Sequence, residues 1–416
     1  MAEIRPLRAL HYNLGAVSSL EDVLAPPYDV INAAGREALL ARSPLNVVEL
    51  DLPVSPSDDD PYEHAAETLE AWTLEGVLRD DHEPAIWALA QDYTGPDGRE
   101  RTRRGLLAAV RVTDYGAGEI RPHERTQPGP KEDRLRLTRA TRHNLSPIFS
   151  LHPGDAWSAI EPALGDPWGE AADADGTRNR VWRVADPAAC EAAVAALADA
   201  ELLIADGHHR YETARVYADE IGGDGPHRYT LMCLVSLDDP GLEVFGYHRL
   251  ISGFDADTAK AKTLAAAIRE HFEVEEIETD AIDPAGEEGA GVFGYIDSHL
   301  RQAFRLRMKD PAALDDVLPD RSAAYRSLDA VVLEELILKR GLGMRDESIA
   351  AKEGIAYAQS TEQALDVLDD HGAAFILRPT PVEQVRAVAA AGETMPPKST
   401  YFFPKVPTGI VFNPLS

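Results

Sequence analysis

The segment 204–214, IADGHHRYETA, places a glycine between an apolar run and a group of basic and polar side chains. Residues 202–205 predict a short buried strand, and a helix is expected from about 209 to 217. A glycine turn at such a junction directs the first backbone N–H groups and the positive end of the helix dipole toward one point, where an anion binds. We therefore predict that four residues bind phosphate here: Gly207, His208, His209 and Arg210. The alternative is a capped helix start with solvated cations.

A second candidate lies at 120–126, IRPHERT, where His123 and Glu124 follow the strand-like Ile120. A carboxylate in this position can serve as a general base toward a hydroxyl group or as a magnesium ligand. The alternative is an ordinary solvated charge in a loop.

Residues 129–144, GPKEDRLRLTRATRHN, gather cations in a chain whose formal net charge is −30. Lys131 and Arg134 stand at helical spacing, and such cations suit a polyphosphate or a substrate carboxylate. A helix with local salt bridges to Glu132 and Asp133 is the alternative.

The segment 395–413, MPPKSTYFFPKVPTGIVFN, is too rich in proline for a regular helix. Five polar side chains crowd into eight positions and are candidates for contacts with substrate or phosphate: Lys398, Ser399, Thr400, Tyr401 and Lys405. An ordered loop of this kind could cover an active site, and a C-terminal packing arm is the alternative. Only 8 of the 41 Lys and Arg residues are lysines, so the lysines in these motifs hint that a compact ammonium charge is needed there.

The segment 25–31, APPYDVI, places two prolines before Tyr28 and Asp29. It is expected to form a stiff turn whose exposed aromatic ring lines a cleft. An ordinary rigid turn is the alternative.

The elements that must position these residues are predicted to form a mixed α/β fold. Strands are expected at 47–52, 85–90, 105–112, 181–184, 202–205, 229–236, 244–247, 292–296, 301–306 and 374–377. Helices are expected at 35–42, 61–78, 187–198, 209–217, 257–272 and 329–338, with helix starts also marked at Ser360 and Thr380. A turn is expected at 95–98 and a long polar loop at 119–150. The chain is expected to divide into an α/β region at 1–118, a core at 119–250 with an insertion at about 152–200, and a C-terminal α/β region at 251–416.

Composition limits the classes of function. A net charge of −30 repels phosphate backbones and argues against general nucleic-acid binding. No run of about 18 apolar residues is present, so no membrane-spanning helix is expected, and the N-terminus does not read as a signal peptide. Two separated cysteines, Cys190 and Cys233, provide neither a disulfide framework nor a cysteine-based zinc site. The expected compartment is therefore the cytosol.

Several motifs, in order, resemble those of the domain of unknown function 1015 family over nearly the whole chain: IRPLRAL, APPYDVI, PHERT with KEDR, IADGHHRYETA and MPPKSTYFFPK. Residues 119–236 also resemble the ParB/sulfiredoxin-like fold and, within it, the free-serine kinases. In those kinases an element like PHE comes first, a strand like PIFS follows, and a second strand leads into DGHHR and a helix. The resemblance implies a ParB/sulfiredoxin-like nucleotide-binding core with N- and C-terminal α/β additions.

By this resemblance, Gly207 to Arg210 would hold nucleotide phosphates, Glu124 would deprotonate the substrate hydroxyl, and Asp206 could assist with the metal or the substrate. His208 stands where sulfiredoxins carry a cysteine, which excludes sulfinic acid repair by thiolate chemistry. The ParB partition proteins pair their nucleotide switch with a DNA-binding domain, whereas this acidic chain shows no convincing helix-turn-helix.

The expected function is therefore phosphoryl transfer from ATP or ADP, with Mg²⁺, to a small hydroxy compound, with free L-serine as the candidate acceptor. Two alternatives stay open at this point. One is a nucleotide-responsive binding or regulatory protein without kinase activity. The other is a metal-dependent hydrolase whose ligands would be His123, Glu124, His208 and His209.

Overall fold

The computed structural model describes residues 2–55, 59–95, 98–124, 126, 128–253 and 258–416, and the chain forms two compact units. Unit 1 comprises residues 1–122, 126–242 and 404–416. Unit 2 comprises residues 123–125 and 243–403. The chain therefore leaves unit 1 twice, and its C-terminal 13 residues return to unit 1.

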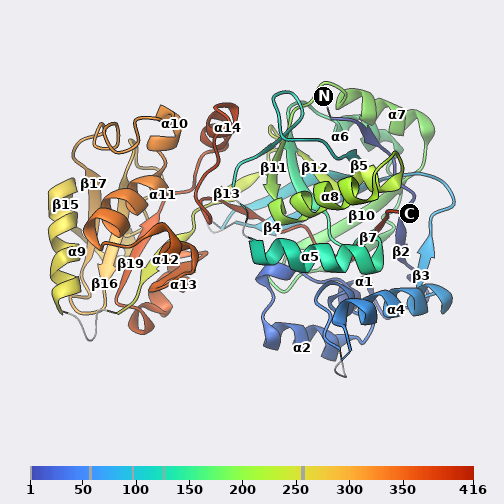
Figure 1. The fold of residues 1–416 in the computed structure, drawn as a ribbon, viewed down its shortest axis with the longest axis horizontal. Helices are drawn as coiled ribbons and strands as arrows, with labels where there is room; N and C mark the ends of the chain where they lie inside the picture. The colour runs from blue at the N-terminus through green and yellow to red at the C-terminus, as the bar shows by residue number, and fades with distance from the viewer. Residues whose placement is uncertain (1, 56–58, 96–97, 125, 127, 254–257) are drawn as a thin grey trace. The chain divides into compact units, whose positions relative to one another are not determined.

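Unit 1 is built around a nine-stranded mixed sheet (Figure 1). The strand order is β6 (Ile120–Pro122), β11 (Leu202–Asp206), β8 (Ile148–His152), β12 (Tyr229–Ser236), β5 (Glu100–Arg111), β4 (Ile86–Thr94), β10 (Arg178–Val184) and β9 (Gly169–Ala172), with β1 (Ile4–Arg5) also on β5. The pairs β11–β6 and β12–β8 are parallel, and the remaining pairs are antiparallel. Strands from both of the predicted regions 1–118 and 119–250 thus meet in one sheet.

The two faces of this sheet carry different side chains. Because side chains alternate along a strand, Leu106, Ala108 and Val110 of β5 face one apolar core, whereas Arg103 faces the other side. The apolar core is completed by α6 (Trp157–Ile160) and α7 (Pro187–Ala196). The Asp186 side chain accepts a hydrogen bond from Ala189 N–H at 2.8 Å, which confirms the predicted start of α7.

The remaining helices of unit 1 are α1 (Leu20–Val23), α2 (Ala33–Arg42), α3 (Val48–Asp51), α4 (Pro61–Leu74), α5 (Pro128–Thr141) and α8 (His208–Ile221). Helix α5 packs against both α4 and α8, and Figure 1 shows it lying beside α8. Three short pairs complete the unit: β2 (Leu10–Tyr12) with β3 (Leu78–Asp80), and β7 (His143–Asn144) with β21 (Asn413–Pro414), together with the bridge between Ala25 and Thr408. The segment 404–416 is thereby tied to unit 1.

Unit 2 has a six-stranded antiparallel sheet in the order β15 (Phe272–Ile277), β17 (Ala303–Met308), β16 (Val292–Asp297), β19 (Ala373–Leu377), β14 (His248–Ile251) and β18 (Ile355–Ala358). Its helices are α9 (Thr258–His271), α10 (Ala323–Arg326), α11 (Asp329–Val332), the π-helical η5 (Leu333–Gly341), α12 (Asp346–Ala350), α13 (Thr361–Asp366) and α14 (Val382–Ala390). A separate two-stranded pair joins β13 (Glu243–Phe245) to β20 (Tyr401–Phe403).

The prediction of a mixed α/β fold is confirmed, and the structure corrects it locally. Residues 47–52 are not a strand: α3 forms there, because Asn46 Oδ1 accepts from Val48 N–H at 3.0 Å and starts a helical turn. The predicted polar loop 119–150 contains helix α5. The predicted insertion at 152–200 supplies β9 and β10 to the main sheet.

One predicted helix start is also wrong. Thr380 does not cap α14, because its hydroxyl donates to the Ser399 carbonyl at 3.0 Å, and Pro381 precedes the helix without a side-chain cap. Ser360 does cap α13, accepting from Gln363 N–H at 3.1 Å. Residues 96–97 of the predicted turn and residue 257 of a predicted helix start lie outside the described residues.

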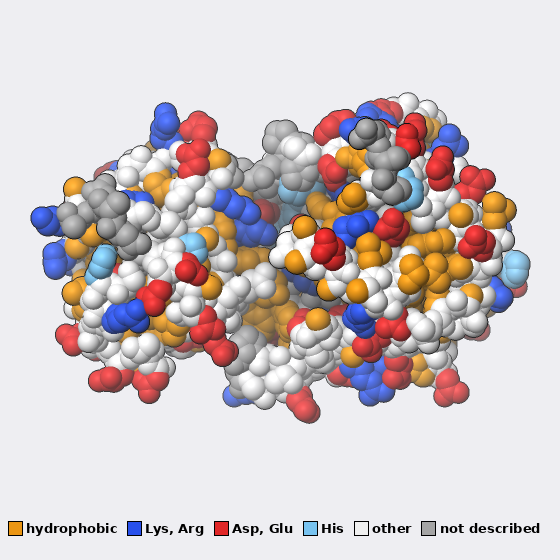
Figure 2. All heavy atoms as spheres, turned by 90° about the horizontal axis from the view of Figure 1, so that it is seen from below, with side chains coloured by type: hydrophobic (Ala, Val, Ile, Leu, Met, Phe, Trp, Pro, Cys, Tyr) orange, Lys and Arg blue, Asp and Glu red, His pale blue; other side chains and the backbone are white. Residues whose placement is uncertain are grey.

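Three further features bear on the expectations from composition. Among the described residues, no helix combines the length and apolar character needed to cross a membrane. Cys190 and Cys233 are both buried free thiols. On the face drawn in Figure 2, Lys and Arg side chains are interspersed with Asp and Glu and are not gathered into one basic surface.

Candidate functional site

The predicted phosphate turn forms between β11 and α8 in unit 1. Strand β11 ends at Asp206, Gly207 adopts a left-handed backbone with φ +91°, and α8 begins at His208. A Cβ atom at Gly207 would lie 2.9 Å from Arg210 Nε. Two features therefore favour glycine at this position: the left-handed backbone conformation and the Arg210 side chain packed against it. The strand–glycine–helix arrangement predicted from the sequence is confirmed.

Arg210 folds back over this turn. Its Nη1 donates to Ser146 Oγ at 2.7 Å and to the Pro147 carbonyl, and its Nη2 lies 3.4 Å from Asp206 Oδ2. The side chain is only 10% exposed. Among the described residues, Arg210 Nε is buried without a hydrogen-bond partner. The guanidinium thus ties the turn to the segment before β8, and its Nε N–H is buried.

Lys405 reaches the same carboxylate from the C-terminal segment. Its Nζ lies 3.4 Å from Asp206 Oδ2, and its side chain is 15% exposed. The backbone carbonyl of Lys405 accepts from Gln91 Nε2 at 2.9 Å, and Gln91 Oε1 accepts from Arg103 Nη2. Arg103 is fully buried, and burial lowers the pKa of its guanidinium to about 10. The sequence separates these residues widely, and only the fold shows that Gln91 and Arg103 support Lys405.

The pKa of the His209 imidazole depends on its burial and on the charges around the turn. Burial lowers the pKa of its imidazole, the charges of Lys131 and Arg210 lower it further, and those of Asp29 and Asp206 oppose the shift. His209 is therefore neutral near pH 7 and acts as a hydrogen-bonding group, not as the cation that the sequence left open.

Charges of both signs surround the turn. Lys131 and Arg210 act on the His209 imidazole together with Asp29 and Asp206, and Lys405 Nζ lies 3.4 Å from Asp206 Oδ2. The turn therefore combines a helix N-terminus with neighbouring cations, an arrangement that favours an anion.

Arg134 is used differently from its prediction as a phosphate or substrate ligand. Its Nη1 donates to Asp51 Oδ1 at 3.0 Å and to the Asp51 carbonyl at 2.7 Å, and its Nη2 pairs with Asp133 Oδ2 at 2.7 Å. The guanidinium also stacks 4.3 Å from the centre of the Tyr28 ring. These bonds hold the APPYDVI turn and α3 against α5. A direct role for Arg134 toward substrate stays a prediction.

The space around the Arg134 side chain is too small for a nucleotide. Burial raises the pKa of the half-buried Tyr28 to about 12, and burial also raises that of Asp51, whose Oδ2 has no hydrogen-bond partner among the described residues. The adjoining cavity measures about 40 Å³ and is lined in part by Asp51, Arg134, Ser146 and Arg210. That volume accommodates water and not a nucleotide. A nucleotide at the turn must therefore lie outside this cavity.

His123 and Glu124 belong to unit 2. His123 is fully buried, and its Nε2 lies 2.8 Å from Thr400 Oγ1. Its carbonyl accepts from Met395 N–H at 2.6 Å, and Glu124 forms a parallel bridge with Met395. The motifs PHERT and MPPKST are thus joined side by side. The His123 ring is thus held in a buried position, and the catalytic role expected for His123 stays a prediction.

Glu124 is half-buried and has a basic neighbour that the sequence did not reveal. Arg249 is buried, which lowers the pKa of its guanidinium, while the charges of Tyr357, Glu334 and Glu124 counteract that shift. The Arg249 guanidinium also stacks 4.9 Å from the centre of the Tyr357 ring. A role for Glu124 as general base stays a prediction.

The other polar residues of the C-terminal motif also lie in unit 2. Ser399 is buried, and its hydroxyl donates to the Pro396 carbonyl at 2.7 Å. Lys398 Nζ lies 5.1 Å above the Tyr247 ring, and Tyr401 belongs to β20, where its ring contacts that of Tyr247. The predicted substrate set is therefore divided: Lys131, Arg134 and Lys405 belong to unit 1, and residues 398–401 to unit 2.

The metal predictions have a mixed outcome. Within the part of the chain that the structure describes, no group of three or more His, Cys, Asp and Glu side chains is placed to hold a metal ion. The hydrolase alternative, which needed four such ligands, is not proposed further. A magnesium ion held mainly by nucleotide oxygens needs only one or two protein carboxylates. Asp206 or Glu124 in that role stays a prediction.

Comparisons with known proteins place this chain in a family. Residues 4–331 match the model of the family described as "Protein of unknown function (DUF1015)", and the chain belongs to that family. No curated protein matches the sequence.

Solved structures give weaker similarities. A conserved hypothetical protein from Pyrococcus furiosus matches at 18% identity and a TM-score of 0.36, over 70% of this chain and 91% of its own. A free serine kinase variant in complex with ADP matches at 14% identity and a TM-score of 0.37, over 70% of this chain and 89% of the kinase chain. SbnI with a C-terminal truncation, from Staphylococcus aureus, matches at 12% identity and a TM-score of 0.37, over 73% of this chain and 85% of its own. All three TM-scores are below 0.5, so they do not establish a common fold.

We expect Gly207→Ala to lower the free energy of unfolding by about 1–3 kcal/mol through left-handed strain, and to lower it further through the contact with Arg210. Gly76→Ala is the matched control, because Gly76 has φ +75° and a Cβ atom added there would meet nothing within 4 Å. Urea unfolding of both variants measures the difference. An equal loss in the two variants would show that the Arg210 contact contributes nothing.

Proposed function

We propose that this member of the DUF1015 family is a nucleotide-dependent phosphotransferase that binds ATP or ADP through its phosphates at Gly207–Arg210. The acceptor is a small hydroxy compound, with free L-serine as the first candidate. One observation carries the proposal: the left-handed turn at Gly207 starts a 14-residue helix, and the cations Arg210 and Lys405 meet at this turn on Asp206. The order of the PHE, PIFS and DGHHR motifs, which resembles that of the free-serine kinases, supports the choice of acceptor.

The proposed contacts follow from the side chains at the turn. Backbone N–H groups of the first turn of α8 would bind phosphate oxygens, with the positive charge of Arg210 beside them. Lys405 and Lys131 would supply point charges, and neutral His209 would supply a hydrogen bond. Phosphoryl transfer depends mainly on positioning and on neutralising charge, so this set of groups suits it.

Mg²⁺ would neutralise further phosphate charge when it is bound with the nucleotide. Asp206 is the carboxylate of the turn, and in this structure it is held by Arg210 and Lys405. A carboxylate is an oxygen ligand of the kind that a magnesium ion prefers. Glu124 is proposed as the base that accepts the proton of the acceptor hydroxyl.

Nucleotide binding is tested by thermal unfolding with ATP or ADP and magnesium. We expect the wild type to gain about 2.7 kcal/mol of stability at 100 times the dissociation constant, and Arg210→Ala and Lys405→Ala to lose most of this gain. Arg178→Ala is the control, because Arg178 lies on β10 near the opposite edge of the sheet and pairs with Glu170. The melting temperature of each variant without nucleotide separates ligand binding from folding. No stabilisation of the wild type by any nucleotide would overturn the proposal.

The role of Glu124 is tested by phosphoryl transfer to L-serine and related hydroxy amino acids. Gln cannot accept the proton, so we expect Glu124→Gln to lower kcat about 100-fold or more while the nucleotide dissociation constant stays unchanged. Glu383→Gln, a change at an exposed carboxylate on α14, should leave kcat at the wild-type value. Unchanged turnover in Glu124→Gln would show that Glu124 is not the base, and binding without any turnover in the wild type would favour a nucleotide-responsive regulatory protein.

A further inference from the structure

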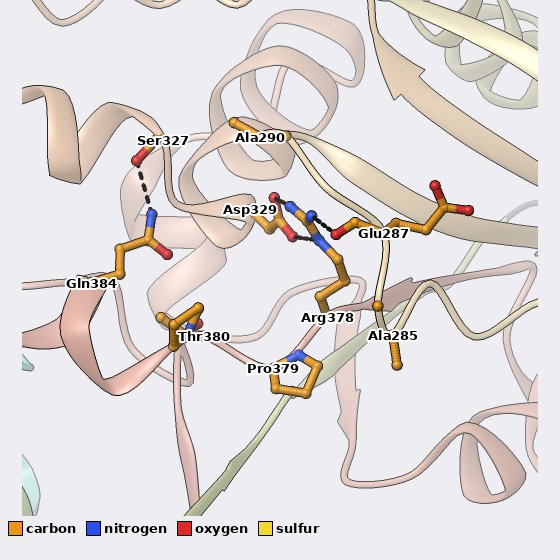
Figure 3. A pocket seen from close by; sticks show the side chains of 12 residues that line it. Ala285, Glu287, Ala290, Ser327, Asp329, Arg378, Pro379, Thr380 and Gln384 are labelled. Carbon is orange, nitrogen blue, oxygen red and sulfur yellow. Dashed lines mark hydrogen bonds and ion pairs between the residues drawn. The ribbon is translucent and has the colours of Figure 1, made fainter. Parts of the chain in front are cut away.

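Unit 2 contains a pocket of about 480 Å³ that none of the predicted motifs explains (Figure 3). Its volume falls within the range of small-molecule sites. Three segments line it: the loop 285–290, the residues Ser327 and Asp329, and the segment from Arg378 to Gln384. All of them belong to unit 2, so the pocket is a feature of that unit alone.

A buried ion pair forms the polar wall of this pocket. Arg378 Nε donates to Asp329 Oδ2 at 2.8 Å, and Arg378 Nη2 donates to Asp329 Oδ1 at 2.7 Å. The two side chains are only 15% and 11% exposed. Arg378 Nη1 also donates to the Glu287 carbonyl at 2.7 Å, and Gly291 N–H donates to Asp329 Oδ1 at 2.8 Å. This set of bonds holds both charged groups in place without a ligand.

The pair retains hydrogen-bonding capacity of both kinds. A guanidinium has five N–H groups, and the bonds to Asp329 and Glu287 use three of those on Arg378. A carboxylate offers about four acceptor positions, and three on Asp329 are used by Arg378 and Gly291. Two donors of a cation and one acceptor of an anion therefore remain side by side.

Apart from Glu287, the rest of the wall is uncharged. Gln384 Nε2 donates to Ser327 Oγ at 2.8 Å, which leaves the Gln384 amide oxygen as an additional acceptor. Ala285, Ala290, Pro379 and Pro381 supply small apolar surfaces. In Figure 3 the carboxylate of Glu287 points away from the ion pair, and it is paired with Arg307 Nη2 at 3.0 Å.

We propose that this pocket binds a zwitterionic α-amino acid, with the ligand carboxylate on Arg378 and the ligand ammonium on Asp329 and Gln384. The ligand complements the pair in both charge and hydrogen bonding. Its carboxylate accepts the two remaining N–H groups, and its ammonium donates to the remaining carboxylate position and to the amide oxygen. The small apolar surfaces face its side chain.

The charge of the pocket selects against simpler ligands. The charges of Arg378 and Asp329 cancel, so a lone anion gains an arginine but is repelled by the adjacent carboxylate. A lone cation is attracted by Asp329 but repelled by the adjacent Arg378. An amino acid has no net charge and carries both signs on neighbouring atoms, so it satisfies both groups at once. The inference does not depend on the proposed nucleotide site.

The test is calorimetric titration of the full chain, without nucleotide, with L-serine, L-alanine and L-leucine. L-lactate, which lacks the ammonium, and L-alaninamide, which lacks the carboxylate, are the matched probes. We expect at least one of the amino acids to bind and both probes to bind at least about tenfold more weakly, because each loses a charged hydrogen bond. No binding of any amino acid, or binding of lactate equal to that of alanine, would overturn the proposal.

Location is tested with Asp329→Asn, which keeps the shape of the side chain and removes its charge. We expect at least about tenfold weaker amino-acid binding. Asp369→Asn is the control, because Asp369 forms an ion pair with Arg301 in which each side chain is 65% exposed. Hydrogen exchange of the wild type should show ligand protection at 285–291 and 378–384, which keeps the test valid should Asp329→Asn fold poorly. Protection elsewhere, with unchanged affinity in Asp329→Asn, would refute this location.

Arg210→Ala separates this proposal from the nucleotide site. We expect it to bind the amino acid as the wild type does. Loss of amino-acid binding in Arg210→Ala but not in Asp329→Asn would assign the ligand to the phosphoryl-transfer site and overturn the pocket proposal.

Discussion

The left-handed backbone of Gly207 is the constraint on which the candidate site depends. It turns the chain from β11 into α8 within one residue, and the absence of a Cβ leaves room for the Arg210 side chain. From there Arg210 reaches Ser146, Pro147 and Asp206, and the carboxylate of Asp206 meets Lys405. The conformation of Gly207 thus lets Arg210 and Asp206 connect the turn to the segment before β8 and to the C-terminal segment.

The two kinds of cation have different uses in this acidic protein. Arginine, with its planar fork of donors, is used to lock buried loops: Arg305 donates to the Ala281, Ile282 and Asp283 carbonyls at 2.6, 3.0 and 3.0 Å, and Arg134 joins Asp51 to α5. The lysines at the turn, Lys131 and Lys405, are point charges beside His209 and Asp206.

Each unit has a polar cluster of its own. In unit 1 it surrounds the start of α8. In unit 2, His123 and Met395 join two distant motifs, and the pair Arg378–Asp329 lines a pocket. Buried charge in both clusters is mostly paired, as the cost of burying an ion requires. Among the described residues, an N–H on Arg210 and an oxygen on Asp51 lack a hydrogen-bond partner, and both residues line the same small cavity in unit 1.

The sequence alone determined the features that local patterns encode. The apolar run before Gly207, the strand at 229–236 and the capped start of α7 at Asp186 were all predictable, because alternation, glycine and capping side chains act over a few residues. The membership of the chain in its family was also legible from the order of its motifs.

Only the tertiary structure decided which distant residues meet. Arg134 and Asp51 are 83 positions apart, and no local pattern predicts their pairing. The burial of His123 against Thr400 and the place of Lys405 at Asp206 likewise depend on contacts made after folding. The physical reason is that burial and ion pairing are set by the neighbours that the fold supplies, whereas backbone conformation at a glycine or a cap is set within a turn of the chain.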